Sequence, residues 1–405
     1  MRSAAERLGE LERAGLYRSL RTVEGPQGPK VVLDGTEVLL LCSNNYLGLA
    51  DHPRVRQAAA EAAERWGAGA GASRLISGNM ALHRKLERRL AEFLGAEDAL
   101  LFGAGYLANT GAVAALAGRG EVVFSDELNH ASLIDGCRLS RAEVFVYRHG
   151  DLEHLDWGLR RAGDRAALIV TDSVFSMDGD VAPLQGLVAR ARFHGCRLMV
   201  DEAHAIGALG PGGRGAVAEA GLTEDVDVIV GTLGKALGSY GAFVCARGEV
   251  RDLLVNTARP FIFSTAPPPP AIGAALAGLA LLASQPGLVE HLAANAAALR
   301  EALASHGLGT GPSRTQIVPV VVGEAGAAMA LCERALERGV FAQAIRPPTV
   351  PEGTSRLRLS VMANHRADEL RGAAGVIAEA AAELGLLPGS RRTLAADVSR
   401  LGRAA

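Results

Sequence analysis

The segment Val226-Asp227-Val228-Ile229-Val230-Gly231-Thr232-Leu233-Gly234-Lys235-Ala236-Leu237-Gly238 joins an apolar run to a glycine-rich turn with one lysine. The apolar run predicts a buried strand, so Lys235 is delivered from the end of that strand. A second apolar run, Leu198-Met199-Val200, leads into Asp201-Glu202-Ala203-His204 and delivers a carboxylate in the same way. The spacing between the two runs predicts neighbouring strands of a parallel sheet, with Asp201 and Lys235 at the same edge.

Lys235 can be interpreted as a Schiff-base lysine. A buried ammonium is costly unless it is paired or neutralised, and covalent attachment to a pyridoxal aldehyde keeps the nitrogen reactive. The alternative is a surface lysine in a glycine-rich turn, and the turn by itself does not decide between them. A phosphate-binding loop is excluded, because its pattern requires glycine at Ile229 and Ser or Thr at Ala236.

Asp201 and His204 are candidates for contacts to a cofactor ring. A carboxylate that keeps a pyridine nitrogen protonated makes the ring an electron sink for a carbanion at the substrate. His204 lies three residues further on and could reach the ring's phenolic oxygen. The alternative is that Asp201 caps the following turn and His204 is a partly buried structural histidine.

Three further strand ends carry polar or glycine residues. Leu100-Leu101-Phe102 leads into Gly103-Ala104-Gly105-Tyr106 and an alanine-rich helical stretch. Amides at such a helix start can bind phosphate, although an ordinary strand-to-helix turn has the same pattern. His130 follows the strand Val122–Asp126 and could stack on a planar ring, and Ser176 follows the strand Ala166–Val170.

Composition is that of a soluble enzyme. The chain has 405 residues, 49% of them hydrophobic, and a formal net charge of −2, which predicts two or three domains and gives no reason to expect nucleic-acid binding. Because no long run is free of Gly, Pro and charge, and residues 1–7 lack a signal core, we expect a cytoplasmic protein without a membrane span. The five cysteines are expected to be buried thiols, with no disulfide or metal site.

The order of patterns predicts an N-terminal arm, an α/β domain and a C-terminal domain. The predicted limits are 1–49 for the arm, 50–283 for the large domain, 284–388 for the small domain and 389–405 for a mobile tail. In the arm we expect a helix over residues 6–20 and a hairpin around Asp34-Gly35. The strand at 241–245 follows Lys235 after a short turn, so it should run antiparallel to its predecessor. In the small domain, strands are expected at 317–322 and 356–361, and an amphipathic helix at 367–384 with Leu370, Ile377 and Leu384 facing inward.

Seven motifs, in order along the chain, resemble those of pyridoxal-phosphate enzymes of fold type I, and within them the α-oxoamine synthases. They are Ser43-Asn44-Asn45-Tyr46-Leu47-Gly48-Leu49, Ser73-Arg74-Leu75-Ile76-Ser77-Gly78, Asn129-His130-Ala131-Ser132, Phe175-Ser176-Met177-Asp178-Gly179, Asp201-Glu202-Ala203-His204, Thr232-Leu233-Gly234-Lys235 and Phe263-Ser264-Thr265. The resemblance implies an α/β fold with a mostly parallel seven-stranded sheet in the large domain and a smaller α+β C-terminal domain. Ala344–Pro351 together with Arg356–Leu359 further resembles the synthases of biotin formation.

The resemblance implies a role for each matching residue. Lys235 would form the Schiff base with pyridoxal 5′-phosphate, Asp201 would contact the pyridinium nitrogen and His204 the ring hydroxyl, while His130 would stack on the ring. The remaining cofactor residues would be Ser176, Thr232 and the amides of Gly105 and Tyr106, with Ser264 and Thr265 reaching the phosphate from the second subunit of a homodimer. Arg358 matches the arginine that holds the amino-acid carboxylate, and Arg18, Asn44 and Thr349 match positions near the acyl substrate or that carboxylate. Because Leu16–Arg21 contains two arginines, a helix-face salt bridge stays open for Arg18 or Arg21.

The family condenses an amino acid with an acyl thioester and releases carbon dioxide. For the branch that this chain resembles, the substrates would be L-alanine and a pimeloyl group on coenzyme A or acyl carrier protein, with the freed Lys235 amine as the base that removes the alpha proton. Two alternatives stay open. One is a synthase that uses glycine with an acetyl or succinyl thioester, or serine with a long acyl thioester. The other is a non-catalytic homologue, which the intact Lys235, Asp201 and Arg358 disfavour.

Overall fold

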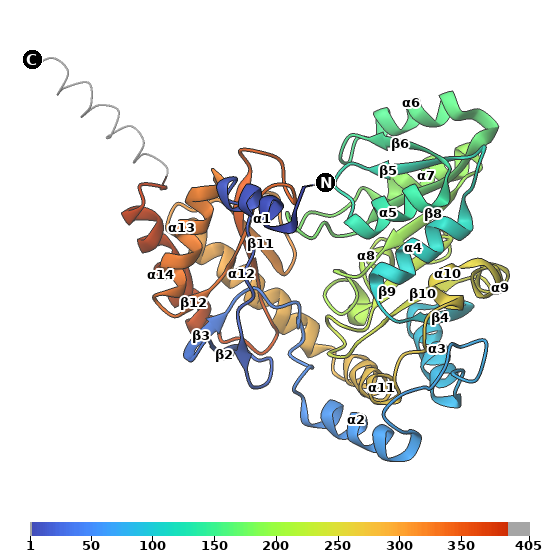
Figure 1. Cartoon of the computed structure of the whole chain (residues 1–405), viewed down its shortest axis with the longest axis horizontal. Coiled ribbons are helices and arrows are strands. Elements are labelled where there is room, and N and C mark those ends of the chain that lie inside the picture. Colours follow the sequence, from blue (N-terminus) through green and yellow to red (C-terminus); the bar gives the residue numbers. More distant parts are fainter. Residues whose placement is uncertain (1, 388–405) are drawn as a thin grey trace, which may run out of the picture. The chain divides into compact units, whose positions relative to one another are not determined.

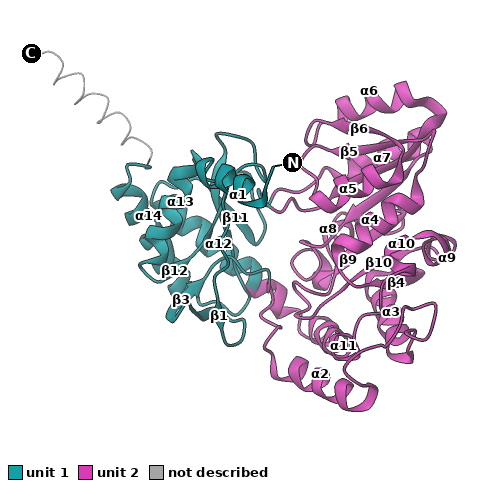
Figure 2. Ribbon diagram, in the orientation of Figure 1, with its two compact units in different colours: residues 1–44, 177–179, 292–405 teal, residues 45–176, 180–291 magenta. Residues whose placement is uncertain are grey.

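The computed structural model describes residues 2–387 (Figure 1) and contains two compact units (Figure 2). Unit 1 consists of residues 1–44, 177–179 and 292–405, and unit 2 of residues 45–176 and 180–291. The N-terminal segment is thus grouped with the C-terminal third of the chain. The domain limits given above stay a prediction, and the tail at 389–405 lies outside the described residues.

Unit 2 is built around a seven-stranded sheet with the strand order β4-β10-β9-β8-β7-β5-β6. The strands are β4 (Asp98–Phe102), β5 (Val122–Asp126), β6 (Glu143–Tyr147), β7 (Ala166–Asp172), β8 (Arg197–Asp201), β9 (Val228–Thr232) and β10 (Ala242–Ala246). The neighbours from β9 to β6 pair in parallel, and β10 is antiparallel to both β9 and β4. The predicted mostly parallel sheet and the antiparallel strand after Lys235 are confirmed.

The helices of unit 2 bury the sheet and explain its continuous apolar runs. They are α2 (Pro53–Trp66), α3 (Ala81–Leu94), α4 (Gly105–Leu116), α5 (Ala131–Ser140), α6 (Leu152–Ala162), α7 (Leu184–His194), α8 (Ala216–Glu219), α9 (Gly248–Thr257), α10 (Arg259–Ile262) and α11 (Pro269–Ser284), with short 3-10 turns at Gly163–Arg165 and Pro211–Gly213. Every residue of β5 and β10 is buried, as expected for strands covered on both faces. One large cluster joins Phe102, Val113, Leu168 and Val230, so the strand ends that carry the candidate site rest on a packed core.

Unit 1 contains two small sheets. The first has the order β1-β2-β3-β12 and the second β11-β14-β13. Its elements are α1 (Ala4–Arg13), β1 (Val23–Glu24), β2 (Lys30–Leu33), β3 (Thr36–Leu40), β11 (Ile317–Gly323), α13 (Ala325–Leu336), β12 (Val340–Phe341), β13 (Gln343–Ile345), β14 (Ser355–Ser360) and α14 (Ala367–Glu383), and it contains most of α12 (Gly287–Ser305). The hairpin β2–β3 is confirmed: Asp34 and Gly35 have φ values of 47° and 83°, as a tight Asp-Gly turn requires. Because β12 pairs in parallel with β3, the predicted arm shares a sheet with the C-terminal part of the chain.

The predicted helix over residues 6–20 is wrong in its second half. Helix α1 ends at Arg13, and Gly15 follows with a left-handed φ of 63°, a common way to terminate a helix. Leu8, Leu11 and Leu20 are exposed rather than on a buried face. In the C-terminal part, β11, β14 and α14 confirm the predicted elements, and Leu370 and Ile377 are fully buried. Leu384 lies just beyond the end of α14 and is only half-buried.

Among residues 2–387, no single helix is long and apolar enough to cross a membrane. The bent pair α11 and α12, with an angle of 81° between them, meets the length and composition of a span only when both are taken together.

Candidate active site

Lys235 lies three residues after the end of β9, and its amine is in contact with a histidine. Its Nζ is 2.8 Å from Nε2 of His204, and Nδ1 of His204 is 2.6 Å from the hydroxyl of Tyr46. Tyr46 is fully buried and His204 is 6% exposed. The chain Tyr46–His204–Lys235 therefore fixes the orientation of the imidazole and places it against the lysine. Tyr46 lies in one of the seven motifs, but no local pattern in that motif predicts this contact.

Asp201 ends β8, directly beside β9, and is buried. Its Oδ1 accepts the amide of Ala203 at 2.8 Å, so part of the predicted turn-capping alternative is also present. Its Oδ2 accepts Nδ2 of Asn109 at 2.6 Å. Asn109 lies on α4, is 1% exposed and was not predicted as a site residue. Both carboxylate oxygens thus accept a hydrogen bond, and these two contacts fix the orientation of the Asp201 side chain.

His130 caps the start of α5 and lies next to the same cluster. Its Nδ1 is 2.7 Å from Oγ of Ser132, and Nδ2 of Asn109 donates to that hydroxyl at 2.8 Å. Partial desolvation lowers the pKa of the His130 imidazole, although much of the residue is exposed; the charge of Asp201 opposes this and that of Lys235 adds to it. His130 thus presents a neutral, half-open ring beside Asp201 and Lys235.

Two further buried carboxyl groups flank Asp201. Asp172 ends β7 at the position paired with Asp201, and its pKa is raised well above the usual range by burial and by the charge of Asp201. Its Oδ2 accepts the backbone amide of His130 at 2.6 Å. Burial also raises the pKa of the fully buried Glu202 to about 7. Burial therefore disfavours the charged forms of Asp172 and Glu202, the two carboxyl neighbours of Asp201.

The segments predicted to bind a phosphate lie at other strand and helix ends. Helix α4 begins at Gly105 as predicted, and no side chain caps its N-terminus, so amides of its first turn are available to an anion. The exposed Tyr106 hydroxyl donates to Asp135. Thr232 donates through Oγ1 to the carbonyl of Gly241 at 3.1 Å and accepts the amide of Gly234 at 3.2 Å. Ser264 and Thr265 follow α10, and Thr265 forms a bridge with Ser73.

In unit 1, Arg358 and Asn44 are brought together. Arg358 is 7% exposed on β14, and its Nη2 donates to Oδ1 of Asn44 at 3.2 Å, while Nη1 donates to Oγ of Ser360 at 2.9 Å. Arg356, two residues earlier on the same strand, instead pairs with the carboxylate of Asp178. The two arginines therefore have different contacts: Arg356 pairs with a carboxylate, and Arg358 donates to an amide oxygen and a hydroxyl.

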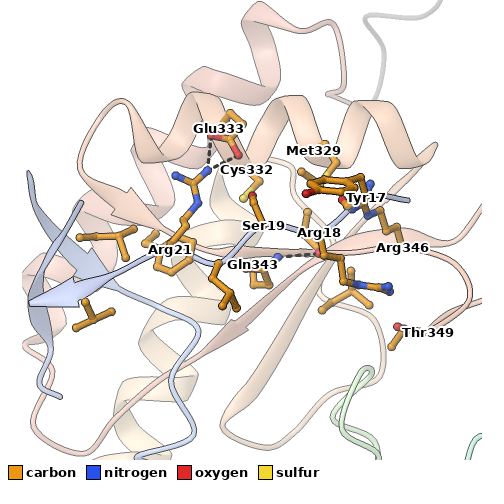
Figure 3. Close-up of a pocket in the computed structure, with 16 residues that line it drawn as sticks. Tyr17, Arg18, Ser19, Arg21, Met329, Cys332, Glu333, Gln343, Arg346 and Thr349 are labelled. Carbon is orange, nitrogen blue, oxygen red and sulfur yellow. Dashed lines mark hydrogen bonds and ion pairs between the residues drawn. The ribbon is translucent and has the colours of Figure 1, made fainter. Parts of the chain in front are cut away.

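Arg18 and Thr349 line one cavity of about 400 Å³ in unit 1 (Figure 3). Arg21 lines it too, and its Nη2 is held by both carboxylate oxygens of Glu333 at 2.6 and 2.7 Å. Arg18 forms no ion pair with any carboxylate in the described part of the chain. The salt-bridge alternative thus applies to Arg21, with a partner on α13 rather than on the same helix. Arg18 remains available to an anionic ligand.

The residues of unit 2 fit pyridoxal phosphate. They offer an amine for its aldehyde, a buried carboxylate for a cationic ring nitrogen, an open imidazole ring for its face and an uncapped helix start for its phosphate. Oδ1 of Asn109 is buried and has no hydrogen-bond partner within residues 2–387, which leaves an acceptor beside Asp201 for a further donor. In the same residues, no three His, Cys, Asp or Glu side chains are grouped to hold a metal ion.

Comparisons with known proteins agree with this geometry. A family model described as aminotransferase class I and II matches residues 36–377. A curated 8-amino-7-oxononanoate synthase from Geobacter sulfurreducens is 55% identical over 389 residues, which cover 95% of this chain and 100% of that protein. A solved serine palmitoyltransferase from S. paucimobilis with a bound PLP–myriocin aldimine has a TM-score of 0.90 and 34% identity, covering 95% of this chain and 98% of that one. An 8-amino-7-oxononanoate synthase from Francisella tularensis has a TM-score of 0.74 and 27% identity, covering 84% of this chain and 97% of that one.

Proposed function

The chain belongs to the class I and II aminotransferase family, and from this premise we propose that it condenses L-alanine with a pimeloyl thioester. The products are 8-amino-7-oxononanoate, carbon dioxide and the free thiol, in biotin biosynthesis. The resemblance seen in the seven motifs is confirmed by the relatives described above, and the cofactor is pyridoxal 5′-phosphate. The observation that carries the chemistry is the amine of Lys235 against His204, beside the buried carboxylate of Asp201.

Pyridoxal phosphate supplies, when bound, an aldehyde that captures the amino acid and a ring that accepts electron pairs from its alpha carbon. Lys235 then acts as the general base, and its amine takes the alpha proton while His204 holds Nζ in place. Asp201, held by hydrogen bonds from Asn109 and the amide of Ala203, would be the partner for a cationic ring nitrogen. His130 would stack on the ring face and polarise the thioester carbonyl.

Arg358 and Asn44 hold the carboxylate of alanine. A guanidinium fork fixes the plane of a carboxylate, and so it selects which bond of the alpha carbon is aligned for cleavage. The burial of Arg358 and its hydrogen bonds to Asn44 and Ser360 support this assignment, because they hold the guanidinium in one orientation. Ser176, Thr232 and the first amides of α4 serve the cofactor and its phosphate.

The enzyme is a cytoplasmic homodimer with shared sites, in which Ser264 and Thr265 of one subunit face the phosphate in the other. Exposed apolar side chains on the two bridged segments support this arrangement: Ile76 is 80% exposed and Phe263 69%. Large apolar residues gathered at adjoining segments are typical of a surface covered by a partner. The other partners are L-alanine and the pimeloyl thioester, with neither nucleic acid nor a membrane.

Steady-state kinetics with the purified holoenzyme test the function. We expect turnover with L-alanine and pimeloyl-coenzyme A or pimeloyl-acyl carrier protein, and the ratio of kcat/KM for these two donors identifies the carrier. Glycine with acetyl- or succinyl-coenzyme A, and serine with palmitoyl-coenzyme A, serve as competitors. Higher kcat/KM with any competitor pair would overturn the assignment to alanine and pimelate.

We expect Arg358→Lys to raise the KM for L-alanine by about tenfold or more. Lysine keeps the charge but loses the planar fork, and a charge-assisted bidentate contact is worth about 1.5–3 kcal/mol. The KM for the thioester should change little. Initial-rate measurements with each substrate varied in turn decide this, with Arg366→Lys as a control, because Arg366 is exposed and pairs only with Asp368 in the described contacts. Loss of affinity confined to the thioester would move Arg358 to the acyl pocket.

We expect Arg18→Gln to raise the KM for the pimeloyl thioester by about tenfold, because its guanidinium is available to the anionic acyl substrate. The matched control is Arg21→Gln, since Arg21 lines the same cavity but is held by Glu333. Measuring both variants with pimeloyl- and heptanoyl-coenzyme A separates charge recognition from packing, because heptanoyl lacks the distal carboxylate. Equal effects of Arg18→Gln on both thioesters would show that Arg18 does not read that carboxylate.

A further inference from the structure

His149 links two segments of the candidate site but has no role in the chemistry described so far. It lies two residues after β6, and β5 ends beside β6 with Asp126 paired to Tyr147. Its Nδ1 is 3.0 Å from Oδ1 of Asp126, and its Nε2 is 2.8 Å from Oδ2 of Asp180. Its ring and that of Phe175 are nearly perpendicular, with centroids 4.4 Å apart and an interplanar angle of 86°.

The geometry decides the charge of this ring. A neutral imidazole has one donor and one acceptor, whereas carboxylates only accept. An imidazole with an ionised carboxylate at each nitrogen must therefore donate from both, which makes it an imidazolium. Burial alone would lower the pKa of His149, but the hydrogen bonds to Asp126 and Asp180 and the charges of both carboxylates raise it to about 10.

Each carboxylate partner organises a loop that carries a predicted cofactor residue. Asp126 accepts the amides of Leu128 and Gly150, both at 2.9 Å, and its carbonyl accepts the amide of Asn129, so it shapes the turn that leads into His130. Asp180 closes the loop after β7, since its carbonyl accepts the amide of Phe175 at 3.1 Å. Ser176 lies within that loop. Oδ1 of Asp180 is buried and has no hydrogen-bond partner within residues 2–387. The contact between Oδ2 and His149 is therefore the main interaction that stabilises this carboxylate.

We propose that His149 is a positioning residue whose charged ring ties the loop of His130 to the loop of Ser176, and so sets the faces between which the cofactor is held. The inference rests on the proposed function only through the cofactor roles of His130 and Ser176. The substrate's identity does not enter it.

Other ionisable groups surround this edge of the sheet. They are Glu127, whose carboxylate accepts the amide of His149; Arg148, which pairs with Asp151; the buried Tyr147; and Asp172. Asp126 is one of the groups that raise the pKa of Asp172. Loss of the cation would therefore remove the positive charge that Asp126 and Asp180 share, while several acidic groups remain nearby. Because the folded-state pKa is raised, the contact is fully present below the ordinary histidine pKa and is lost as pH rises through about 10.

The test is His149→Gln in the full chain, with the dissociation constant of pyridoxal phosphate measured by absorbance titration from pH 5.5 to about 9.5. The glutamine amide can donate a hydrogen bond to one carboxylate, but its oxygen then faces the other carboxylate, and two acceptors repel each other. We therefore expect the dissociation constant of pyridoxal phosphate to rise by about tenfold at pH 8. The wild-type constant should begin to rise as the pH approaches about 10 and the His149 imidazolium loses its proton, whereas the constant of His149→Gln should lack that rise. The thermal midpoint, followed in parallel, checks that the variant folds.

His154→Gln is the matched control, because His154 accepts the amide of Arg148 at 3.0 Å and has no ion pair with a carboxylate among the described residues. A double-mutant cycle with Asp180→Asn adds a second readout: the cost of removing the Asp180 charge should shrink at least threefold once His149 is replaced. Wild-type cofactor affinity at pH 8, or a loss equal to that of His154→Gln, would overturn the proposal. Failure of pimeloyl turnover alone would bear on the proposed function and leave this result intact.

Discussion

Lys235→Ala is expected to abolish turnover, with a loss of about 10⁴-fold or more, because the variant lacks both the covalent anchor and the general base. It should also lose the borohydride-reducible adduct with pyridoxal phosphate. The fold should persist, because the Lys235 side chain is only half-buried and its contact with His204 is one hydrogen bond. Mass spectrometry after reduction, together with kinetics, measures both effects.

The composition of the chain sharpens this experiment. Only three lysines occur, at positions 30, 85 and 235, so a pyridoxyl mass can be assigned without ambiguity. Lys85 is exposed, and Lys30 is exposed and pairs with Glu369 at 2.9 Å. Lys85→Ala is therefore the matched control, with turnover and adduct retained. A pyridoxyl group found on Lys30 or Lys85 of the wild-type protein would contradict the assignment.

The strand ends could be predicted because their signal is local. Continuous apolar runs predicted β8 and β9, and the first charged residues after them are Asp201 and Lys235, which the parallel pairing of the two strands brings to one sheet edge. The short turn after Lys235 likewise predicted the antiparallel β10. The positions of such residues depend only on one strand and its neighbour in the sheet.

Contacts that depend on distant segments could not be predicted in the same way. Tyr46 reaches His204, and Asn109 reaches Asp201, across long stretches of sequence, and only the packing of α4 and of the chain before α2 fixes these pairs. His149 shows the same difficulty, because neither carboxylate partner is near it in sequence. At the N-terminus the apolar spacing suggested a longer helix, but the left-handed Gly15 overrides that periodicity. The roles of the site residues remain predictions that the variants test.

Asp201→Asn is expected to slow loss of the alpha proton of L-alanine by on the order of 10²- to 10³-fold, the usual cost of removing a preorganised electrostatic partner. An amide cannot stabilise a protonated ring nitrogen as a carboxylate does, so the ring accepts electrons less well. Exchange of the alpha proton in deuterated water, followed by nuclear magnetic resonance without thioester, isolates this step from acyl transfer. Alanine should still bind, since Arg358 and Asn44 are unchanged.

Asp172→Asn provides the sharpest comparison. Asp172 ends the adjacent strand at the position paired with Asp201, but burial and the Asp201 charge raise its pKa well above the usual range. Burial already disfavours the charged form of Asp172, so an amide there alters less charge than the same change at Asp201, and an amide oxygen can still accept the backbone hydrogen bond from His130. We therefore expect Asp172→Asn to slow exchange by less than about tenfold. Equal losses in the two variants would mean that the negative charge needed by the ring is shared by both strands rather than held at Asp201.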